Sequence, residues 1–313
     1  MISMREVTKV FPGSSAPAVS SLSLDVDAGE TLVLVGPSGC GKTTTMKMVN
    51  RLVEPTSGTI LVGGTDVTKQ DVVELRRGIG YVIQSIGLMP HRTVAENVVT
   101  VPKLVGWDEA RRKSRLAELA EMLELDRDLL DRYPSELSGG QRQRVGVARA
   151  LAVDPPVMLM DEPFGAVDPI VRERLQDQFL RIQAELKKTI VFVTHDVDEA
   201  LKMADRIAIL NRGGILEQLA SPAEILRAPA NDFVQRFIGG ERALKRLALL
   251  KVRDVELDAP GPSADAHVYA ATSLLEALDA IVTSKTGVVE VRDESGAVTG
   301  VLTLDAIRTE LGA

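Results

Sequence analysis

The chain has 313 residues, a formal net charge of −7 and one cysteine. The acidic balance argues against a dedicated nucleic-acid binder, and a single cysteine excludes an intramolecular disulfide framework. The chain starts without a signal-like stretch and lacks a run of about 20 apolar residues. We therefore expect a cytoplasmic protein that reaches a membrane only through an integral partner chain. Its length predicts one large domain and a small one.

The amino-terminal part alternates apolar and polar residues over 3–11 and 20–26, as half-buried antiparallel strands do. A β-branched run over residues 31–35 then predicts a buried strand, and residues 44–51 can continue as a helix. Between them lies the loop Gly36-Pro37-Ser38-Gly39-Cys40-Gly41-Lys42-Thr43. It matches a phosphate-binding P-loop at every required position, in the required order of strand, loop and helix. The sequence thus predicts nucleotide binding.

The residue types in this loop suit a polyphosphate. Glycines let successive backbone N–H groups and the positive end of the following helix point at one anion. Lys42 adds a mobile positive charge for the β and γ phosphates, and the Thr43 hydroxyl is placed to coordinate Mg²⁺. Cys40 is expected to be only a small side chain. Upstream, Phe11 could stack on an adenine or pack in the core, and the residues alone leave both possibilities open.

The middle of the chain changes from strands to helices. Residues 59–62 and 79–83 are typical of strands, and Gln84 follows the second one. Helical periodicity then extends from residue 85 to about 154. Within it, Leu137-Ser138-Gly139-Gly140-Gln141 opens a strong helix. That helix start is a second predicted anion-binding site.

Two further strands end in residues that carry chemistry. The apolar run 157–160 leads into Asp161 and Glu162; Asp161 is placed to hold Mg²⁺ and Glu162 to orient or deprotonate a water. Residues 189–193 predict another buried strand, after which His195 follows. Parallel strands bring their carboxyl ends to one edge, so we expect His195 to contact the γ-phosphate, with a structural histidine as the alternative.

The remaining part contains a hairpin and a separate tail. Residues 207–210 and 215–219 flank a glycine-rich turn, and short helices are expected over 222–238. Residues 241–252 are either an amphipathic connector or a solvated helix face, and 259–263 predict a flexible break. The tail then shows a helix, two strands around a turn and a last helix, at about 274–281, 288–291, 298–303 and from 304.

Over residues 1 to about 240, six motifs in order resemble those of the ATP-binding subunit of an ATP-binding cassette (ABC) transporter. They are the Walker A loop (36–43), the Q-loop Gln84, the signature (137–141), Walker B (158–162), the D-loop (165–168) and the switch His195. The D-loop departs mildly from the common pattern, with Gly165 in place of Ser and Val167 in place of Leu. The resemblance implies an α/β P-loop NTPase with an antiparallel β subdomain and a helical subdomain inserted at about 86–154.

The resemblance also implies a mechanism shared between two copies of the chain. Two such domains pair head to tail, so that the signature of one completes the P-loop site of the other. Catalytic roles fall on Glu162, His195, Gln84 and Lys42, and Mg²⁺ is held by Thr43, Gln84 and Asp161. The implied ATP contacts are Phe11, Gly36, Pro37, Ser38, Gly39, Cys40, Gly41, Lys42, Thr43, Thr44, Ser138, Gly139, Gly140, Gln141 and Asp168.

Two stretches, 80–94 and 161–169, resemble the corresponding sequences in importers for glycine betaine, choline, carnitine and related quaternary amines. This implies integral permease subunits, an extracytoplasmic solute-binding protein and a peripheral position on the inner face of the cell membrane. Three alternatives are an importer for another small solute, a soluble ABC ATPase acting on nucleic acid or ribosomes, and a regulator that binds nucleotide without hydrolysis. The acidic balance disfavours the second, and Glu162 with His195 disfavours the third.

The tail resembles a single cystathionine β-synthase (CBS) motif over residues 264–313, reached through a connector at 241–263. Because CBS motifs work in pairs, the resemblance implies that the two tails of a dimer pair and regulate transport. A merely structural tail is the alternative.

Overall fold

The computed structural model describes residues 1–165, 167–259 and 264–311, so Ala166 of the D-loop and most of the break predicted at 259–263 lie outside the described residues. The chain divides into two compact units, Met1–Ser221 and Pro222–Ala313. Each unit has its own sheet and its own apolar core.

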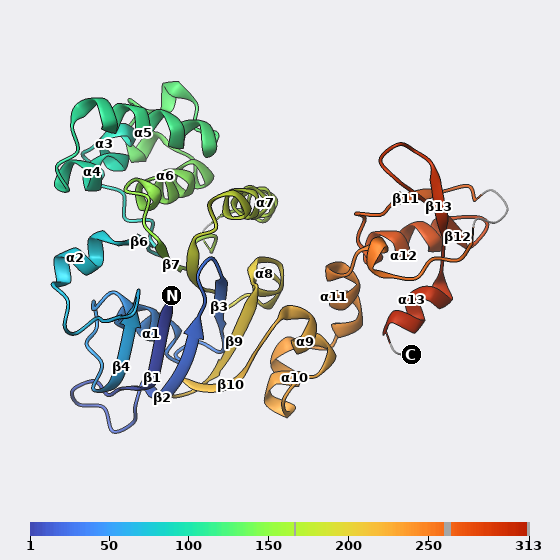
Figure 1. Ribbon diagram of the computed structural model, residues 1–313, viewed down its shortest axis with the longest axis horizontal. Helices are drawn as coiled ribbons and strands as arrows, with labels where there is room; N and C mark the ends of the chain where they lie inside the picture. Colours follow the sequence, from blue (N-terminus) through green and yellow to red (C-terminus); the bar gives the residue numbers. More distant parts are fainter. Residues whose placement is uncertain (166, 260–263, 312–313) are drawn as a thin grey trace. The chain divides into compact units, whose positions relative to one another are not determined.

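A mixed sheet forms the centre of the first unit, with the strand order β10-β9-β3-β8-β7-β6 among the described residues (Figure 1). Its strands are β3 (Thr31–Val35), β6 (Ile79–Val82), β7 (Val157–Asp161), β8 (Thr189–Val193), β9 (Arg206–Asn211) and β10 (Ile215–Ala220). β3, β7 and β8 are buried at every residue and pair in parallel, which is why they read as continuous apolar runs. Only β10 is antiparallel to its neighbour, through the predicted hairpin.

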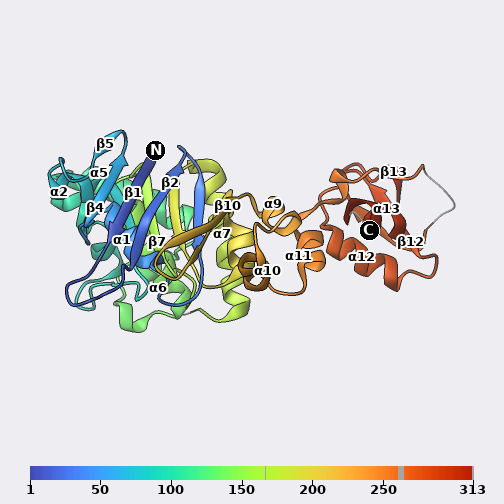
Figure 2. The same ribbon diagram turned by 90° about the horizontal axis from the view of Figure 1, so that it is seen from below.

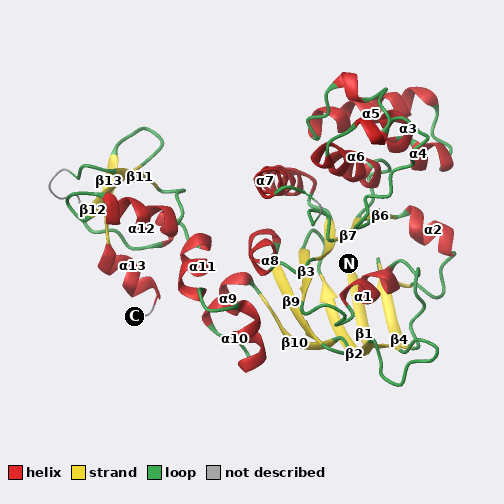
Figure 3. Ribbon diagram, turned by 180° about the vertical axis from the view of Figure 1, so that it is seen from behind, coloured by secondary structure: helices red, strands yellow, loops and turns green. Residues whose placement is uncertain are grey.

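An antiparallel sheet with the order β2-β1-β4-β5 accompanies the central one. Its strands are β1 (Ile2–Lys9), β2 (Val19–Val26), β4 (Ser57–Val62) and β5 (Thr65–Asp66), and Figure 2 shows the first three side by side. The main core combines apolar side chains of both sheets with Met46, Met48 and Val49 of α1 (Lys42–Val49). In Figure 3, α1 is drawn across the strands of this region. The helix that starts at the P-loop is therefore fixed by packing along its length.

The other helices of the first unit fall into two groups. The helices α3 (Val94–Val98), α4 (Thr100–Leu104), α5 (Glu109–Met122) and α6 (Gly139–Leu151) form one group (Figure 1), of which α6 also contacts β6. Side-chain oxygens of Thr93, Asp108 and Ser138 cap three of them, as their sequence positions predict. The remaining helices are α2 (Val72–Arg77), α7 (Pro169–Leu186) and α8 (Val197–Met203). The predicted α/β class with an antiparallel sheet and an inserted helical region is confirmed.

The second unit contains a three-stranded sheet with the order β11-β12-β13, namely His267–Tyr269, Val288–Arg292 and Val298–Thr303. Its helices are α9 (Pro222–Arg227), α10 (Asp232–Ile238), α11 (Arg242–Leu249), α12 (Leu274–Thr283) and α13 (Leu304–Leu311). The helices and strands expected in the tail are present, and β11 is an addition. A strand of three residues is too short to show an alternation of apolar and polar side chains. The sequence therefore gave no sign of β11 or of its parallel pairing with β12.

The boundary between the units differs from the sequence expectation of about residue 240, because the division comes after Ser221. α11 is not a free connector: Leu247 is 2% exposed and belongs to the tail core together with Val252 and Leu274. Arg246 donates from its guanidinium to the carbonyls of Glu310 (2.9 Å) and Leu311 (3.1 Å), at the end of α13. The basic residues of this helix thus include one with a structural role in the tail.

Gly80 of β6 provides a test of the packing between sheet and helix. A Cβ atom at Gly80 would lie 2.6 Å from the backbone oxygen of Ala150 on α6, and backbone cannot move aside cheaply. We expect Gly80→Ala to lower the free energy of unfolding by about 1–3 kcal/mol, as overpacking does. Urea denaturation, followed through the unfolding transition of the first unit, measures this change in the free energy of unfolding.

Gly78→Ala is the matched control, because a Cβ there would meet its nearest atom at an ordinary 3.5 Å. Its effect should stay within about 0.5 kcal/mol. Equal stability of the two variants would contradict the close approach of α6 to β6.

Candidate active site

The P-loop connects the end of β3 to the start of α1 and depends on two crowded glycines. Gly36 and Gly41 have φ values of 151° and 105°, a region that L side chains rarely adopt. A Cβ at Gly36 would lie 2.1 Å from the Leu210 oxygen, and one at Gly41 2.4 Å from the Ala18 oxygen. The loop can therefore keep this shape only without side chains at these positions. The Cys40 side chain is fully buried beneath the loop.

Lys42 folds back over the same loop. Its ammonium donates to the carbonyl oxygens of Gly36 (2.7 Å) and Pro37 (3.2 Å), and the residue is 7% exposed. Carbonyl oxygens satisfy its donors without neutralising its charge. The charge thus remains available to an anion bound in the loop.

Thr43 and Asp161 join the P-loop to the end of β7. The Thr43 hydroxyl donates to Asp161 Oδ1 at 3.0 Å, although 118 residues separate them in the chain. Asp161 is 5% exposed, and this burial raises the pKa of its carboxyl above the ordinary value, partly offset by the Thr43 hydrogen bond. Its own burial, together with the negative charge of Asp161, raises the pKa of the Tyr81 hydroxyl to about 12.

The hydroxyl oxygen of Thr43 and the carboxylate oxygens of Asp161 fit a magnesium ion that is shared with a phosphate ligand. Mg²⁺ in phosphate-transfer sites takes one or two protein oxygens and completes its octahedron with waters and phosphate oxygens. A hydroxyl and a carboxylate in contact supply that pair. Within residues 1–165, 167–259 and 264–311, no three His, Cys, Asp or Glu side chains are placed to hold a metal by themselves. The residues therefore suit a metal that arrives with its nucleotide.

Glu162 is the point where three segments of the site meet. Its carboxylate accepts a hydrogen bond from Gln84 Nε2 at 2.8 Å and lies 3.1 Å from His195 Nδ1. Its backbone has φ +45°, an uncommon value for a side chain of this size, and its N–H donates to the Val193 oxygen at 2.9 Å. Strain of this kind persists where the surroundings hold a functional group in position. Gln84, Glu162 and His195, predicted separately, are thus brought together.

The signature residues 137–141 lie at the start of α6 and not at the contacts around Glu162. Ser138 caps α6: its hydroxyl accepts from Gln141 N–H (3.3 Å), while the Gln141 side chain accepts from Ser138 N–H (2.8 Å). Gly139 and Gly140 form the first turn of this helix. No hydrogen bond or ion pair among the described residues joins this helix start to the P-loop. A single chain does not bring the two predicted anion sites together.

Two other predicted contacts have clear local environments. The Phe11 ring is 40% exposed, with the Lys9 ammonium 5.1 Å from its centroid, so Phe11 is not a core residue. Asp168 caps α7 by accepting from the Ile170 N–H at 3.0 Å. The exposed ring leaves the stacking interpretation of Phe11 in place as a prediction.

Two arginines that sequence reasoning missed connect these motifs. Arg172 donates to the Val167 oxygen (3.2 Å) in the D-loop and lies 3.7 Å from Asp196, the neighbour of His195. Arg149 on α6 donates to the Ile86 oxygen (2.7 Å) just after Gln84, and burial lowers its pKa. Neither position carries a motif signal, because each acts on backbone oxygens that only the fold brings within reach.

The raised pKa of Asp161 predicts a stability change. The native state binds this proton more tightly than the unfolded state, so the ionised carboxylate lowers stability at neutral pH. We expect Asp161→Asn to raise the thermal midpoint at pH 7, and the gain to shrink as the pH falls through the raised pKa toward the ordinary value of 3.8, below which the carboxyl is protonated in both states.

Thermal unfolding of both proteins between pH 4 and 8 measures this difference. Asp66→Asn, at the end of β5 where hydrogen bonds from Thr68 lower the pKa of the carboxyl, should instead lose stability at neutral pH. A midpoint of Asp161→Asn below wild type at every pH would contradict the burial argument.

Comparison with known proteins identifies the family. A model described as ABC transporter matches residues 19–165. The chain is 57% identical over 245 residues to the glycine betaine/carnitine/choline transport ATP-binding protein OpuCA of Bacillus subtilis, covering 78% of this chain and 64% of OpuCA. It is 57% identical over 259 residues to the osmoprotectant import ATP-binding protein OsmV of Salmonella typhimurium, covering 82% and 68% of the two chains.

A solved dimeric ATP-binding cassette, MJ0796 with bound ADP and Pi, superposes with a TM-score of 0.64 at 32% identity, over 71% of this chain and 99% of MJ0796. In the described part of the chain, no helix is long and apolar enough to cross a membrane. The P-loop, the Thr43–Asp161 contact and the contacts of Glu162 with Gln84 and His195 agree with these comparisons. This chain belongs to the family of ABC transporter ATP-binding proteins.

Proposed function

We propose that this chain hydrolyses ATP with Mg²⁺ and thereby drives an importer for quaternary-amine osmoprotectants. The observation that carries the proposal is the position of Glu162, held by Gln84 and His195 at the same sheet edge as the P-loop. A carboxylate fixed beside a nucleotide loop is placed to act on an attacking water rather than on the nucleotide alone.

The roles of the side chains follow from their contacts. Lys42 and the P-loop N–H groups hold the phosphates, and Glu162 orients the water and takes its proton. His195 holds one oxygen of that carboxylate and Gln84 the other, so both are positioned to respond when a γ-phosphate is present. A magnesium ion, held by Thr43 and Asp161 with Gln84 nearby, would supply positive charge for the phosphate oxygens.

The separation of the two anion sites supports a dimer as the active species. Ser138 is exposed at the start of α6, whereas Lys42 and Thr43 lie at the start of α1, in another part of the same unit. Head-to-tail pairing would place the signature of one chain on the P-loop of a second. MJ0796 is described as a dimeric ABC transporter cassette, which agrees with this arrangement.

The solute and the partners are proposed by similarity. OpuCA and OsmV are named for quaternary amines and osmoprotectants at 57% identity, whereas the sulfate/thiosulfate import protein CysA of Pseudomonas aeruginosa is 44% identical. Quaternary-amine import is therefore favoured over another small solute. Integral permease subunits would hold the chain at the inner membrane face, and a solute-binding protein would deliver the amine. The aligned part spans about two thirds of these relatives, 64% of OpuCA and 68% of OsmV.

The tail is proposed to regulate transport by pairing with the tail of the second chain, as the CBS resemblance suggests. Its own core, formed around Leu247, Leu274 and Leu302, supports an independent folding unit. A fair test must remove the whole of α11, because a cut at residue 250 would leave Leu247 without the core that covers it.

We expect Glu162→Gln to lower the steady-state ATPase rate at least about 100-fold while nucleotide binding is retained, because the amide keeps the shape but cannot accept the water's proton. Phosphate release by the full chain with Mg²⁺ measures the rate, and a fluorescent ATP analogue measures binding. Glu74→Gln, which removes an exposed carboxylate paired with Arg77 on α2, is the matched control. Equal rates for Glu162→Gln and wild type would remove Glu162 from this role.

Uptake of labelled solutes tests the importer. Cells that express the chain together with permease subunits of a quaternary-amine importer should accumulate choline, carnitine or glycine betaine, and should take up sulfate no faster than cells without the chain. Deletion of residues 241–313 should preserve uptake but change its dependence on external salt. Sulfate uptake alone would favour the alternative solute class, and an unchanged salt response would make the tail purely structural.

A further inference from the structure

The segment that follows Gln84 has an unfavourable backbone conformation. Ile86 has φ +61°, in the left-handed region, and Gly87 has φ +59°. Glycine adopts such values at little cost, whereas a β-branched side chain at positive φ is a genuine outlier. Strained residues persist only where the surrounding structure holds them, and they cluster at sites that carry function. Ile86 therefore needs neighbouring groups that stabilise this conformation.

Helix α6 supplies those groups. The guanidinium of Arg149 donates to the carbonyl oxygens of both Ile86 (2.7 Å) and Gly87 (2.5 Å). Its planar fork of N–H donors suits two neighbouring acceptors. The Ile86 side chain lies against the same helix, because a Cβ atom at Gly146 would be 2.9 Å from Ile86 Cγ2. α6 thus contacts the strained residue at its oxygen and at its side chain.

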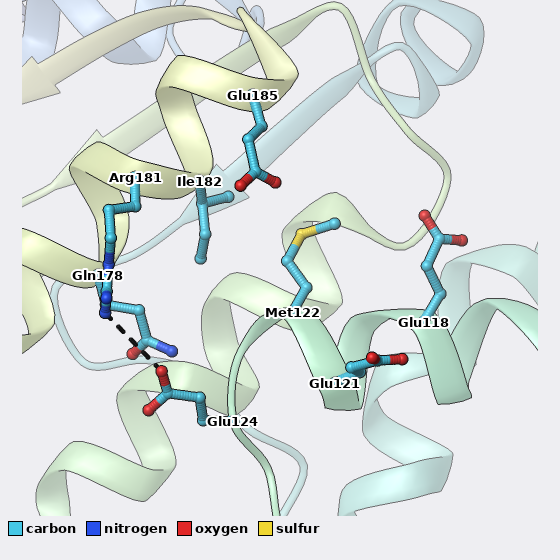
Figure 4. Close-up of a pocket in the computed structure, with 8 residues that line it drawn as sticks. All are labelled: Glu118, Glu121, Met122, Glu124, Gln178, Arg181, Ile182 and Glu185. Carbon is cyan, nitrogen blue, oxygen red and sulfur yellow. Dashed lines mark ion pairs between the residues drawn. The ribbon is translucent and has the colours of Figure 1, made fainter.

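Arg149 makes these hydrogen bonds without a carboxylate beside it. In the ranges that the structure describes, no acidic side chain lies within ion-pair distance of its guanidinium. Arg181 of α7 shows the commoner arrangement, since it lies 3.8 Å from Glu124 (Figure 4). Burial lowers the pKa of Arg149. A guanidinium taken partly out of water is costly unless its donors are satisfied, so the two loop carbonyls are its stabilising partners.

The part of α6 that carries Arg149 is fixed against the sheet. A Cβ atom at Gly80 of β6 would lie 2.6 Å from the oxygen of Ala150, the next residue along α6. β6 is also the strand that leads into Gln84. The segment 85–87 is therefore held at one end by β6 and at the other by a helix packed on that same strand.

We propose that Arg149 is a positioning residue for ATP hydrolysis, which holds the segment 85–87 so that Gln84 stays in contact with the Glu162 carboxylate. The Gln84 side chain is exposed and donates to Glu162 at 2.8 Å, so its place depends on the backbone that carries it. Without the guanidinium, the segment relaxes toward ordinary φ values and Gln84 moves away. The inference rests on the proposed function of Glu162 and adds a residue that touches no reacting group.

Arg149→Met tests the proposal, because it keeps a long side chain and removes the donors. Phosphate release by the full chain with Mg²⁺ should give a kcat at least about tenfold lower, because small misplacements of catalytic groups are costly. The KM for ATP should stay within about threefold of wild type, since the P-loop is unchanged.

Arg144→Met is the matched control. Arg144 lies on the same helix and also donates to two backbone oxygens, those of Leu123 and Glu124, but these follow α5 and not Gln84. Its kcat should stay within about twofold of wild type. Arg149→Lys, compared with Arg144→Lys, keeps the charge and loses the fork, and its kcat should lie between those of Arg149→Met and wild type. This pair gives the same test if Arg149→Met does not fold.

Ile86→Gly provides a readout that a general loss of stability would not move. Glycine adopts a positive φ without strain, so the segment no longer needs the guanidinium to keep its shape. We expect Ile86→Gly to raise the kcat of Arg149→Met at least about fivefold and not to raise the kcat of wild type.

Hydrogen exchange without nucleotide measures the segment directly. The N–H groups of Ile86 and Gly87 donate to the oxygens of Ile83 (2.8 Å) and Ser85 (2.7 Å). Exchange over residues 83–88 should be faster in Arg149→Met than in wild type or Arg144→Met. This readout involves no hydrolysis, so it stands apart from the role of Glu162.

The proposal is overturned if Arg149→Met keeps the wild-type kcat, if Arg144→Met loses as much, or if Ile86→Gly leaves the rate of Arg149→Met unchanged. A failure of the proposed function gives a different pattern. In that case Glu162→Gln keeps the wild-type rate, whatever Arg149→Met does to hydrogen exchange. A low rate for Glu162→Gln beside a wild-type rate for Arg149→Met rejects only the present inference.

Discussion

Parallel pairing of buried strands is the constraint on which the site depends. In the order β3-β8-β7-β6, each strand is followed by one functional element: the P-loop, His195, Glu162 and Gln84. Because parallel strands end on the same edge, four segments that are far apart in the chain meet there. The order of strands in space, and not their order in the sequence, sets which side chains touch.

This edge is also where the protein tolerates unfavourable local structure. Asp161 is a buried carboxyl with a raised pKa, Glu162 has a positive φ, and Gly36 and Gly41 lie against backbone oxygens. The fully buried strands and the α1 core hold these groups in place. Carboxylates held together in this way are suited to receive a metal ion, whose positive charge offsets theirs.

Polar side chains of the site make hydrogen bonds to other groups of the protein. Lys42 donates to loop carbonyls, Thr43 to Asp161, and Gln84 to Glu162. These hydrogen bonds hold the side chains in position relative to one another.

The sequence by itself determined the longer strands, the P-loop, the order of motifs and the family, because apolar runs, helix caps and glycine spacing are local signals. It also pointed to Glu162 and His195, since a residue after a buried strand has a predictable place. Only the tertiary structure decided that Gln84 and His195 share one carboxylate, that Arg172 joins the D-loop to Asp196, and that α11 belongs to the tail core. These contacts join residues that are far apart in the chain. Which residues meet depends on which strands and helices become neighbours, and the packing of the whole core determines that rather than any local pattern.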